Sequence, residues 1–234
     1  MQQQPPQDNP ILSFVNSIPP ISRILFVSLI ATFLALVTNV VSDFDLFFDP
    51  QHAFMKMQLW RCITTFTYMG TDIISVFFSL VTLYRTAVDL EQQSFQGRPE
   101  DMLFMVLMGM TLFLIAGWIL TLPFLFNCLF FYLLYIWARR NPYARVNFLF
   151  IPMPAPYLPY VMVLVNFAMG NKILPIIIGL VVGHIYWYFA DVLPLQTGRQ
   201  YLHTPNVIKA LFQHQERPRV GRQRWGRGHR LGEE

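Results

Sequence analysis

Charged residues are scarce in this sequence, and so is cysteine. Only 13% of the 234 residues are charged, whereas soluble domains contain about 25%. The two cysteines, Cys62 and Cys128, lie within apolar stretches, which predicts buried free thiols rather than a disulfide framework. The composition, 54% apolar, predicts a polytopic membrane protein, and no nucleic-acid partner, metal or cofactor is expected.

The longest stretch without any charge runs from Met102 to Ala138. Because one span needs about 20 apolar residues, this stretch predicts two spans joined by a tight turn. Six spans are expected in all. They cover residues 24–41, 63–84, 102–121, 122–138, 157–170 and 173–190. The prolines of "IPMPAPYLP" exclude a helix just before the fifth span.

Lysine and arginine are absent before Arg23. Because a cleavable signal peptide begins with a positively charged region, the first span is expected to remain as an anchor. Six spans place both termini on one side, together with 14 of the 17 Lys and Arg residues. Only Lys56, Arg61 and Lys172 fall on the other side. The positive-inside rule therefore predicts that both termini are cytosolic.

Three segments have the pattern of short amphipathic helices that lie on a membrane surface. "NPILSFVNS", "DPQHAFMKMQLWR" and "TPNVIKALF" each start with a helix-capping residue followed by proline. Short helices packed on the spans would look the same, so both interpretations stay open. The loop between the first two spans is rich in Phe and Met, and we expect it to be embedded in the membrane.

The predicted organisation has three parts. They are a polar N-terminus with a short interfacial helix (1–17), a six-span membrane domain (18–195) and a cytosolic tail with an amphipathic helix (196–234). Four polar residues lie within or near the spans. They are Asp72, Asn127, Asn166 and His184. Because an ionisable group in hydrocarbon costs roughly 2.5–3.5 kcal/mol, such residues usually face protein or water. His184 fits either catalysis and proton transfer or a hydrogen bond between helices.

Two residue pairs have recognisable physical roles. Gly179 and Gly183 form a Gly-x-x-x-Gly pattern, which lets two helices approach closely. Trp60 and Arg61 stand just before the second span. They fit an interfacial anchor, with the indole at headgroup depth. Alternatively, Arg61 pins the long loop against the bundle through hydrogen bonds.

Several segments taken together resemble one known family. They are "IPPISR", "QLWRCIT", "LYRTAVDLEQQSFQGRPEDMLFM", "YIWARRNPYARVNF", "GLVVGHIYWYFADVLP" and the terminal "LGEE". From about Ile18 to its end, the chain resembles the Derlins, rhomboid-like pseudoproteases of the endoplasmic reticulum. The resemblance implies an all-α membrane protein with a six-transmembrane rhomboid-like bundle. In it, Trp60 and Arg61 are the loop pair, and Gly179 and Gly183 the sixth-span pair.

The same resemblance implies a function and partners. Derlins act in endoplasmic-reticulum-associated degradation, in which misfolded proteins are moved back to the cytosol. The implied partners are misfolded proteins, a membrane ubiquitin-ligase complex, the lipid bilayer and further copies of the chain. A path across the membrane could be completed by any of these proteins.

The last eleven residues, "RWGRGHRLGEE", follow an Arg-rich polar stretch. A patch for anionic lipids would explain the arginines, but not the order of Trp225, Gly226, Gly228 and Leu231. That order resembles the SHP box, through which Derlins bind the hexameric AAA ATPase called valosin-containing protein. Glycines permit close backbone approach, and the Trp and Leu side chains can fill two apolar pockets.

Serine is absent after Ser94, and this argues against a rhomboid protease. Such proteases use a Gly-x-Ser-Gly serine on the fourth span and a histidine on the sixth, within hydrogen-bond reach of each other. Cys128 with His184 is the remaining protease alternative. A solute transporter would show inverted repeats, and none is visible in the sequence. A non-catalytic binding or conduit protein is the leading hypothesis.

Overall fold

The structure is a computed structural model that describes residues 15–50, 53, 56–148, 151–199 and 201–212. Within this part of the chain, four helices are long and apolar enough to cross a membrane. They are α2 (Pro20–Val37), α5 (Ile73–Asp89) with its π-helical extension η2 (Leu90–Ser94), α6 (Pro99–Leu120), and the continuous helix of α9 (Leu174–Trp187), η4 (Tyr188–Val192) and α10 (Leu193–Thr197). These four correspond to the first, second, third and sixth predicted spans.

Two shorter helices correspond to the remaining predicted spans. α7 (Phe126–Arg140) has 15 residues and α8 (Leu158–Ala168) has 11. At 1.5 Å per residue, they are about 22 Å and about 16 Å long, less than the hydrocarbon core of about 30 Å. Length therefore supports four spans, and the six-span, rhomboid-like arrangement remains a prediction.

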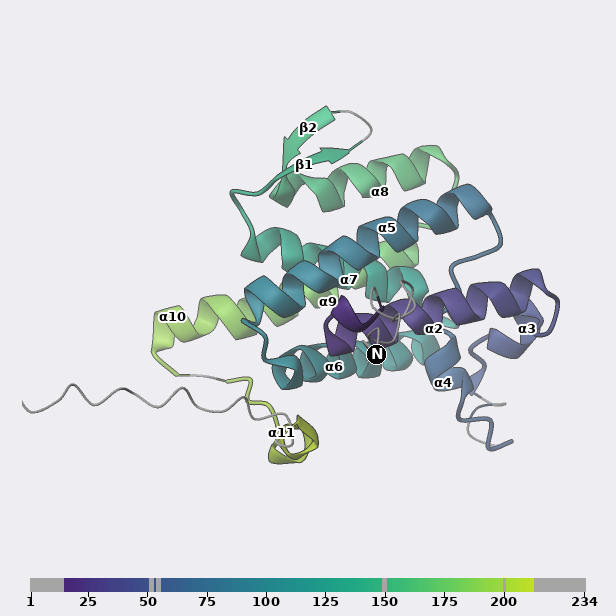
Figure 1. The fold of residues 1–234 in the computed structure, drawn as a ribbon, viewed down its shortest axis with the longest axis horizontal. Coiled ribbons are helices and arrows are strands. Elements are labelled where there is room, and N and C mark those ends of the chain that lie inside the picture. The colour runs from purple at the N-terminus through teal and green to yellow at the C-terminus, as the bar shows by residue number, and fades with distance from the viewer. Residues whose placement is uncertain (1–14, 51–52, 54–55, 149–150, 200, 213–234) are drawn as a thin grey trace, which may run out of the picture.

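The helices run roughly along the long axis of the molecule, and their ends gather at two opposite ends (Figure 1). One, which we name the loop end, contains α3 (Asp43–Leu46) and α4 (Arg61–Thr64). At the other, the polar end, Glu91 of η2 bonds to Ser22 at the start of α2. There Arg140 at the end of α7 also bonds to Asp191 in η4. Successive long helices thus alternate in direction, and α7 runs parallel to α9.

α7 forms the centre of the fold. Every residue from Cys128 to Ala138 is buried, as expected for a helix that is largely apolar on all sides. The Tyr132 hydroxyl donates to the Met105 carbonyl of α6 (2.9 Å). Gly109 of α6 makes room for this ring, since a Cβ there would lie 2.8 Å from it. The packing of α7 against α6 therefore depends on complementary shape as well as on apolar side chains.

The second predicted span begins later than expected. Residues 65–72 are not helical, and α5 begins at Ile73. Asp72 caps this helix by accepting a hydrogen bond from the Ser75 N–H (2.8 Å). The first N–H groups of a helix have no partner within it, so a carboxylate is favoured there. Asp72 is exposed at the start of the helix. It therefore lies near the span, facing water, rather than within it, because the span begins later than predicted.

The predicted interfacial segments have different outcomes. The C-terminal one forms α11 (Asn206–Phe212), whereas most of "NPILSFVNS" lies outside the described residues. "DPQHAFMKMQLWR" is not one continuous helix, because residues 57–60 are not helical and Met57 has a left-handed φ of 57°. Residues 51, 52, 54 and 55 of this segment also lie outside the described part.

One strand pair departs from the all-α prediction. β1 (Arg145–Phe148) pairs antiparallel with β2 (Ile151–Pro154). Proline cannot continue a helix, but it is tolerated in edge strands, and both strands of a hairpin are edges. A 3₁₀ turn, η3 (Ala155–Tyr157), leads from β2 into α8. The predicted exclusion of an α-helix from this proline-rich segment therefore holds up to Leu158.

Candidate functional site

Arg61 ties the first loop together at the loop end. Its Nη1 donates to the carbonyls of Phe44 (2.6 Å) and Phe47 (3.0 Å), and its Nε donates to Gln58 Oε1 (2.6 Å). These bonds have the form expected if Arg61 pins the loop. Trp60 beside it is 55% exposed, so its indole is free to reach a headgroup region.

Gly179 and Gly183 both lie in the contact between α7 and α9. A Cβ on Gly179 would lie 2.5 Å from the Cys128 carbonyl oxygen, and one on Gly183 would lie 3.2 Å from the Tyr135 Cβ. The glycines thus let the two helices pack with almost no side chain between them. The contact at Gly179 is the tighter of the two and involves backbone, which cannot rotate away.

His184 forms a hydrogen bond between these same helices. Its Nδ1 lies 2.6 Å from the Tyr135 hydroxyl, which accepts a hydrogen bond from Arg139 Nε (2.9 Å). The Arg139 guanidinium also lies 5.1 Å from the centre of the Trp187 ring. This geometry matches the interpretation of His184 as a helix-to-helix contact.

Cys128 and His184 are not arranged as nucleophile and base. Cys128 lies opposite Gly179, five residues before His184, which corresponds to about 7.5 Å along the helix axis. A catalytic pair needs hydrogen-bond reach, about 3 Å. The geometry therefore gives no support to the cysteine-protease alternative.

The two asparagines lie apart from these contacts. Asn127 is exposed in the first turn of α7. Asn166 Nδ2 donates to the Met162 carbonyl one turn earlier (2.8 Å), and its Oδ1 accepts from Asn171 Nδ2 (3.0 Å). Asn166 therefore fixes the end of α8 locally. The predicted residues do not meet in one site, since the Trp60–Arg61 pair lies at the loop end and His184 within the α7–α9 contact.

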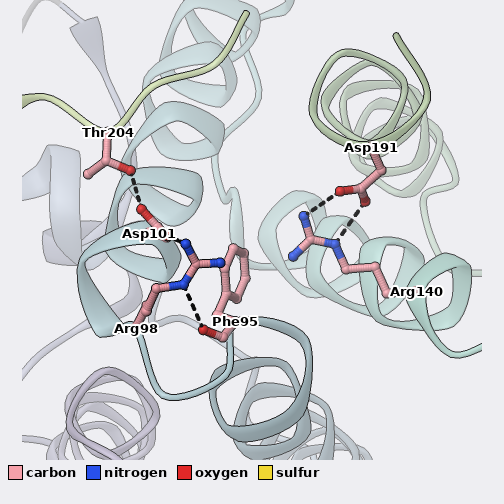
Figure 2. A network of polar contacts seen from close by, with 6 residues as sticks. All are labelled: Phe95, Arg98, Asp101, Arg140, Asp191 and Thr204. Atoms are coloured by element: carbon pink, nitrogen blue, oxygen red, sulfur yellow. Dashed lines mark hydrogen bonds and ion pairs between the residues drawn. The ribbon is translucent and has the colours of Figure 1, made fainter. Parts of the chain in front are cut away.

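The polar end holds a set of ion pairs that the sequence did not predict (Figure 2). Arg140 binds Asp191 through two parallel hydrogen bonds, from Nε (2.8 Å) and from Nη2 (2.9 Å). Such bidentate pairs are the strong form of this interaction. The Arg140 guanidinium also lies 4.4 Å from the centre of the Phe95 ring. This pair joins the end of α7 to η4 and continues the α7–α9 contact to the edge of the molecule.

A fully buried carboxylate joins η2 to α2. Glu91 is 1% exposed and accepts three hydrogen bonds: from the Ile21 N–H (3.0 Å), the Ser22 N–H (2.7 Å) and the Ser22 hydroxyl (2.7 Å). Its negative charge faces the positive end of the α2 dipole. Glu91 and Asp191 both stand in π-helical turns, which are frequent at functional sites.

These carboxylates left only a weak signal in the sequence. Each is an acid at the end of an apolar run, and charges at span ends are ordinary. No group of three or more His, Cys, Asp or Glu suited to a metal ion occurs in the described part of the chain. What the polar end can do chemically is therefore to fix helix ends and to attract charged groups.

Comparison with known proteins places the chain in a family. The model of the Der1-like family matches residues 18–206. Similar proteins include Derlin-2 of Oryza sativa subsp. japonica, 31% identical over 209 residues that cover 84% of each chain. Derlin-2.1 of Arabidopsis thaliana is 32% identical over 209 residues, or 84% of this chain and 86% of the relative. The probable derlin-2 homolog of Dictyostelium discoideum is 30% identical over 219 residues, or 90% and 86%.

The chain belongs to the Der1-like, or Derlin, family. As a Derlin with apolar helices, it is a multi-pass membrane protein. Membership of the Derlins, known as rhomboid-like pseudoproteases, supports a broad role in endoplasmic-reticulum-associated degradation and suggests a protein that is not an enzyme. The Derlin match ends at residue 206. The terminal motif of Trp225, Gly226, Gly228 and Leu231 lies beyond it and outside the described residues.

Proposed function

We propose that this Derlin is a non-catalytic component of degradation at the endoplasmic reticulum membrane, with both termini in the cytosol. It binds misfolded proteins and forms a path for their return to the cytosol. It does so alone, with further copies of itself or with a membrane ubiquitin-ligase complex. The sequence contains no nucleotide-binding P-loop, so the force comes from the AAA ATPase that the tail recruits.

The shortness of α8 is the observation that carries this proposal, because the other short helix, α7, is buried in the centre of the fold. With 11 residues, α8 falls about 14 Å short of a hydrocarbon core of about 30 Å, and it exposes apolar side chains such as Leu164 and Phe167. A bilayer adapts to such a helix by thinning, at fractions of a kcal/mol per Å. A thin, hydrated region lowers the cost of exposing backbone, otherwise several kcal/mol per unsatisfied group. An unfolded chain would cross most easily there.

The loop end supports the same proposal. Phe44 is 82% exposed and Met57 75% exposed, although both are apolar and lie in a segment held by Arg61. Side chains of this kind suit a loop that is submerged in a leaflet better than one in water. A submerged loop would add to the local disturbance of the bilayer.

Bilayer thickness around the reconstituted protein tests the path. In cryo-EM maps of nanodiscs, we expect the membrane to be several Å thinner beside α8 than beside α6. Inserting Leu-Val-Leu-Ala after Val163 lengthens α8 by about 6 Å, and should reduce the thinning beside α8 and slow substrate degradation. Uniform thickness around the unaltered protein would refute the proposed path.

Recruitment of the ATPase is tested separately in the tail. Changing Trp225 and Leu231 to Ala removes both apolar anchors, so the ATPase should no longer co-purify while membrane insertion is unchanged. Changing Arg222, Arg224 and Arg227 to Gln is the matched control, and should weaken co-purification less. If the arginine variant loses the ATPase and the Trp–Leu variant keeps it, the tail acts only as an electrostatic patch.

A further inference from the structure

A pocket of about 610 Å³ opens between the helix ends at the polar end. Its lining comes from η2, the start of α6, the end of α7, η4 and the segment that leads into α11. This volume lies within the usual range of small-molecule sites, about 300–1,000 Å³. Because the long helices end here, the pocket lies where the headgroups of a bilayer would begin.

Phe95 holds two arginines at this pocket (Figure 2). Its carbonyl accepts a hydrogen bond from Arg98 Nε (3.4 Å), and its ring lies 4.4 Å from the Arg140 guanidinium. Each arginine also has a carboxylate partner, Asp101 for Arg98 (3.1 Å) and Asp191 for Arg140 (2.8 Å). The two guanidinium groups are therefore oriented before any ligand arrives.

Arg98 keeps donors for a further acceptor. A guanidinium has five N–H donors, and Phe95 and Asp101 contact only Nε and Nη1 of Arg98. Arg140 is more fully engaged, because Asp191 binds its Nε and Nη2 and Tyr186 is a further hydrogen-bond partner. The Arg98 side chain is 60% exposed, so an incoming group can reach it without displacing the core.

Lys209 of α11 supplies a third cation to the lining. Three cations then face two carboxylates, Asp101 and Asp191, and both carboxylates are already paired. The pocket therefore has a surplus of one positive charge. α11 is positioned over the pocket by the Thr204 hydroxyl, which donates to Asp101 Oδ1 (2.5 Å).

We propose that this pocket binds a phosphate monoester, the group carried by phosphorylated lipid headgroups and by free phosphate. A phosphate monoester carries about −1.5 to −2 charges at neutral pH, opposite in sign to this surplus. Arginine forks are suited to phosphate oxygens. Basic pockets between span ends are a known way to hold anionic headgroups. Its cations, Arg98, Arg140 and Lys209, are different residues from the tail arginines that start at Arg217.

Ligand-induced stabilisation of the detergent-solubilised full chain tests this proposal. The probes are dioctanoyl phosphatidylinositol 4-phosphate, dioctanoyl phosphatidylcholine as a neutral control, and inorganic phosphate. We expect the phosphorylated lipid to raise the unfolding midpoint in a saturable manner and the neutral lipid not to. Arg98→Gln combined with Lys209→Gln should weaken apparent binding by about tenfold or more, since each lost cation–phosphate contact is worth roughly 1 kcal/mol or more.

Two controls separate this pocket from general charge effects. Arg145→Gln removes an exposed cation in β1, and the Arg222, Arg224 and Arg227 to Gln variant removes tail cations. Arg145→Gln should bind the probe as the unaltered chain does, and the tail variant should keep the saturable component of binding. If inorganic phosphate stabilises and competes as well as the lipid, the site is supported and free phosphate is its source. No stabilisation by either probe, or binding that survives in the Arg98–Lys209 variant, would overturn the proposal.

Discussion

Removing the Glu91 carboxylate should destabilise the fold as a whole. α2 begins at Pro20 and has no side-chain cap from its own first residues. Its free N–H groups at Ile21 and Ser22 donate instead to Glu91, and the Ser22 hydroxyl adds a third bond. Because Glu91 is 1% exposed and Ser22 2% exposed, water cannot take over these bonds. Glu91→Ala leaves at least three donors without an acceptor.

The expected magnitude follows from these contacts. Hydrogen bonds to a charged group contribute about 1.5–3 kcal/mol each, and they do not add fully. We therefore expect Glu91→Ala to lower the free energy of unfolding by about 3–5 kcal/mol, as for other broken buried networks. Glu91→Gln keeps the shape and one acceptor oxygen, but turns an NH₂ donor toward N–H groups. Its expected loss is about 1.5–3 kcal/mol.

Thermal unfolding in detergent, followed by circular dichroism, measures the effect. For a chain of this size, 1 kcal/mol corresponds to a midpoint shift of about 2–4 °C, so Glu91→Ala should lower the midpoint by at least about 6 °C. Glu100→Gln in the first turn of α6 is the control, because a helix-dipole contribution is only about 0.3–1 kcal/mol. A Glu91→Ala midpoint equal to that of the control would refute the reasoning.

Three further predictions concern the other contacts. Gly179→Ala should lower the unfolding midpoint more than Gly183→Ala, because its Cβ would lie 2.5 Å from a backbone carbonyl rather than 3.2 Å from a side-chain carbon; equal midpoints would contradict this. Arg61→Lys should slow the degradation of a misfolded substrate, measured by pulse-chase, nearly as much as Arg61→Ala, because an ammonium group cannot make the several directed hydrogen bonds of a guanidinium. If both variants degrade the substrate at the unaltered rate, Arg61 serves only as an interfacial anchor. Asp191→Asn should destabilise by about 1–3 kcal/mol, because it leaves the partly buried Arg140 charge without its carboxylate. Replacing both residues by Leu should recover part of the loss; if the double variant melts no higher than Asp191→Asn, the pair has another role.

The apolar runs of the sequence predicted the long helices well. A helix that crosses a membrane needs a long apolar segment, and such a segment can be recognised from composition alone. The uncharged stretch from Met102 to Ala138 did divide into two helices, α6 and α7. Boundaries were harder, since they depend on single caps. Asp is one of the residues preferred at a helix N-cap. Because Asp72 stands in an apolar run, however, it was interpreted as part of the span.

Contacts between distant residues could not be predicted from one sequence. Glu91 and Ser22 lie 69 residues apart, and Arg140 and Asp191 lie 51 apart, so no local pattern links them. The Gly179–Gly183 pattern predicted a close helix contact, but not that Cys128 would face Gly179. The β1–β2 hairpin was missed because prolines indicate what a segment cannot form rather than what it does form.

The parallel pairing of α7 with α9 also sets an order of events during synthesis. Cys128 meets Gly179, which leaves the ribosome 51 residues later (179 − 128 = 51). At about 5–20 residues per second, this is an interval of about 3–10 seconds. During that time the face of the central helix that α9 will cover stays open, while its other later neighbours, η3 and α8, are still being made. The last of the four long helices to be made is thus the one that completes the centre. A chain stalled before it would leave one face of the central helix uncovered, where quality control in the membrane could bind it.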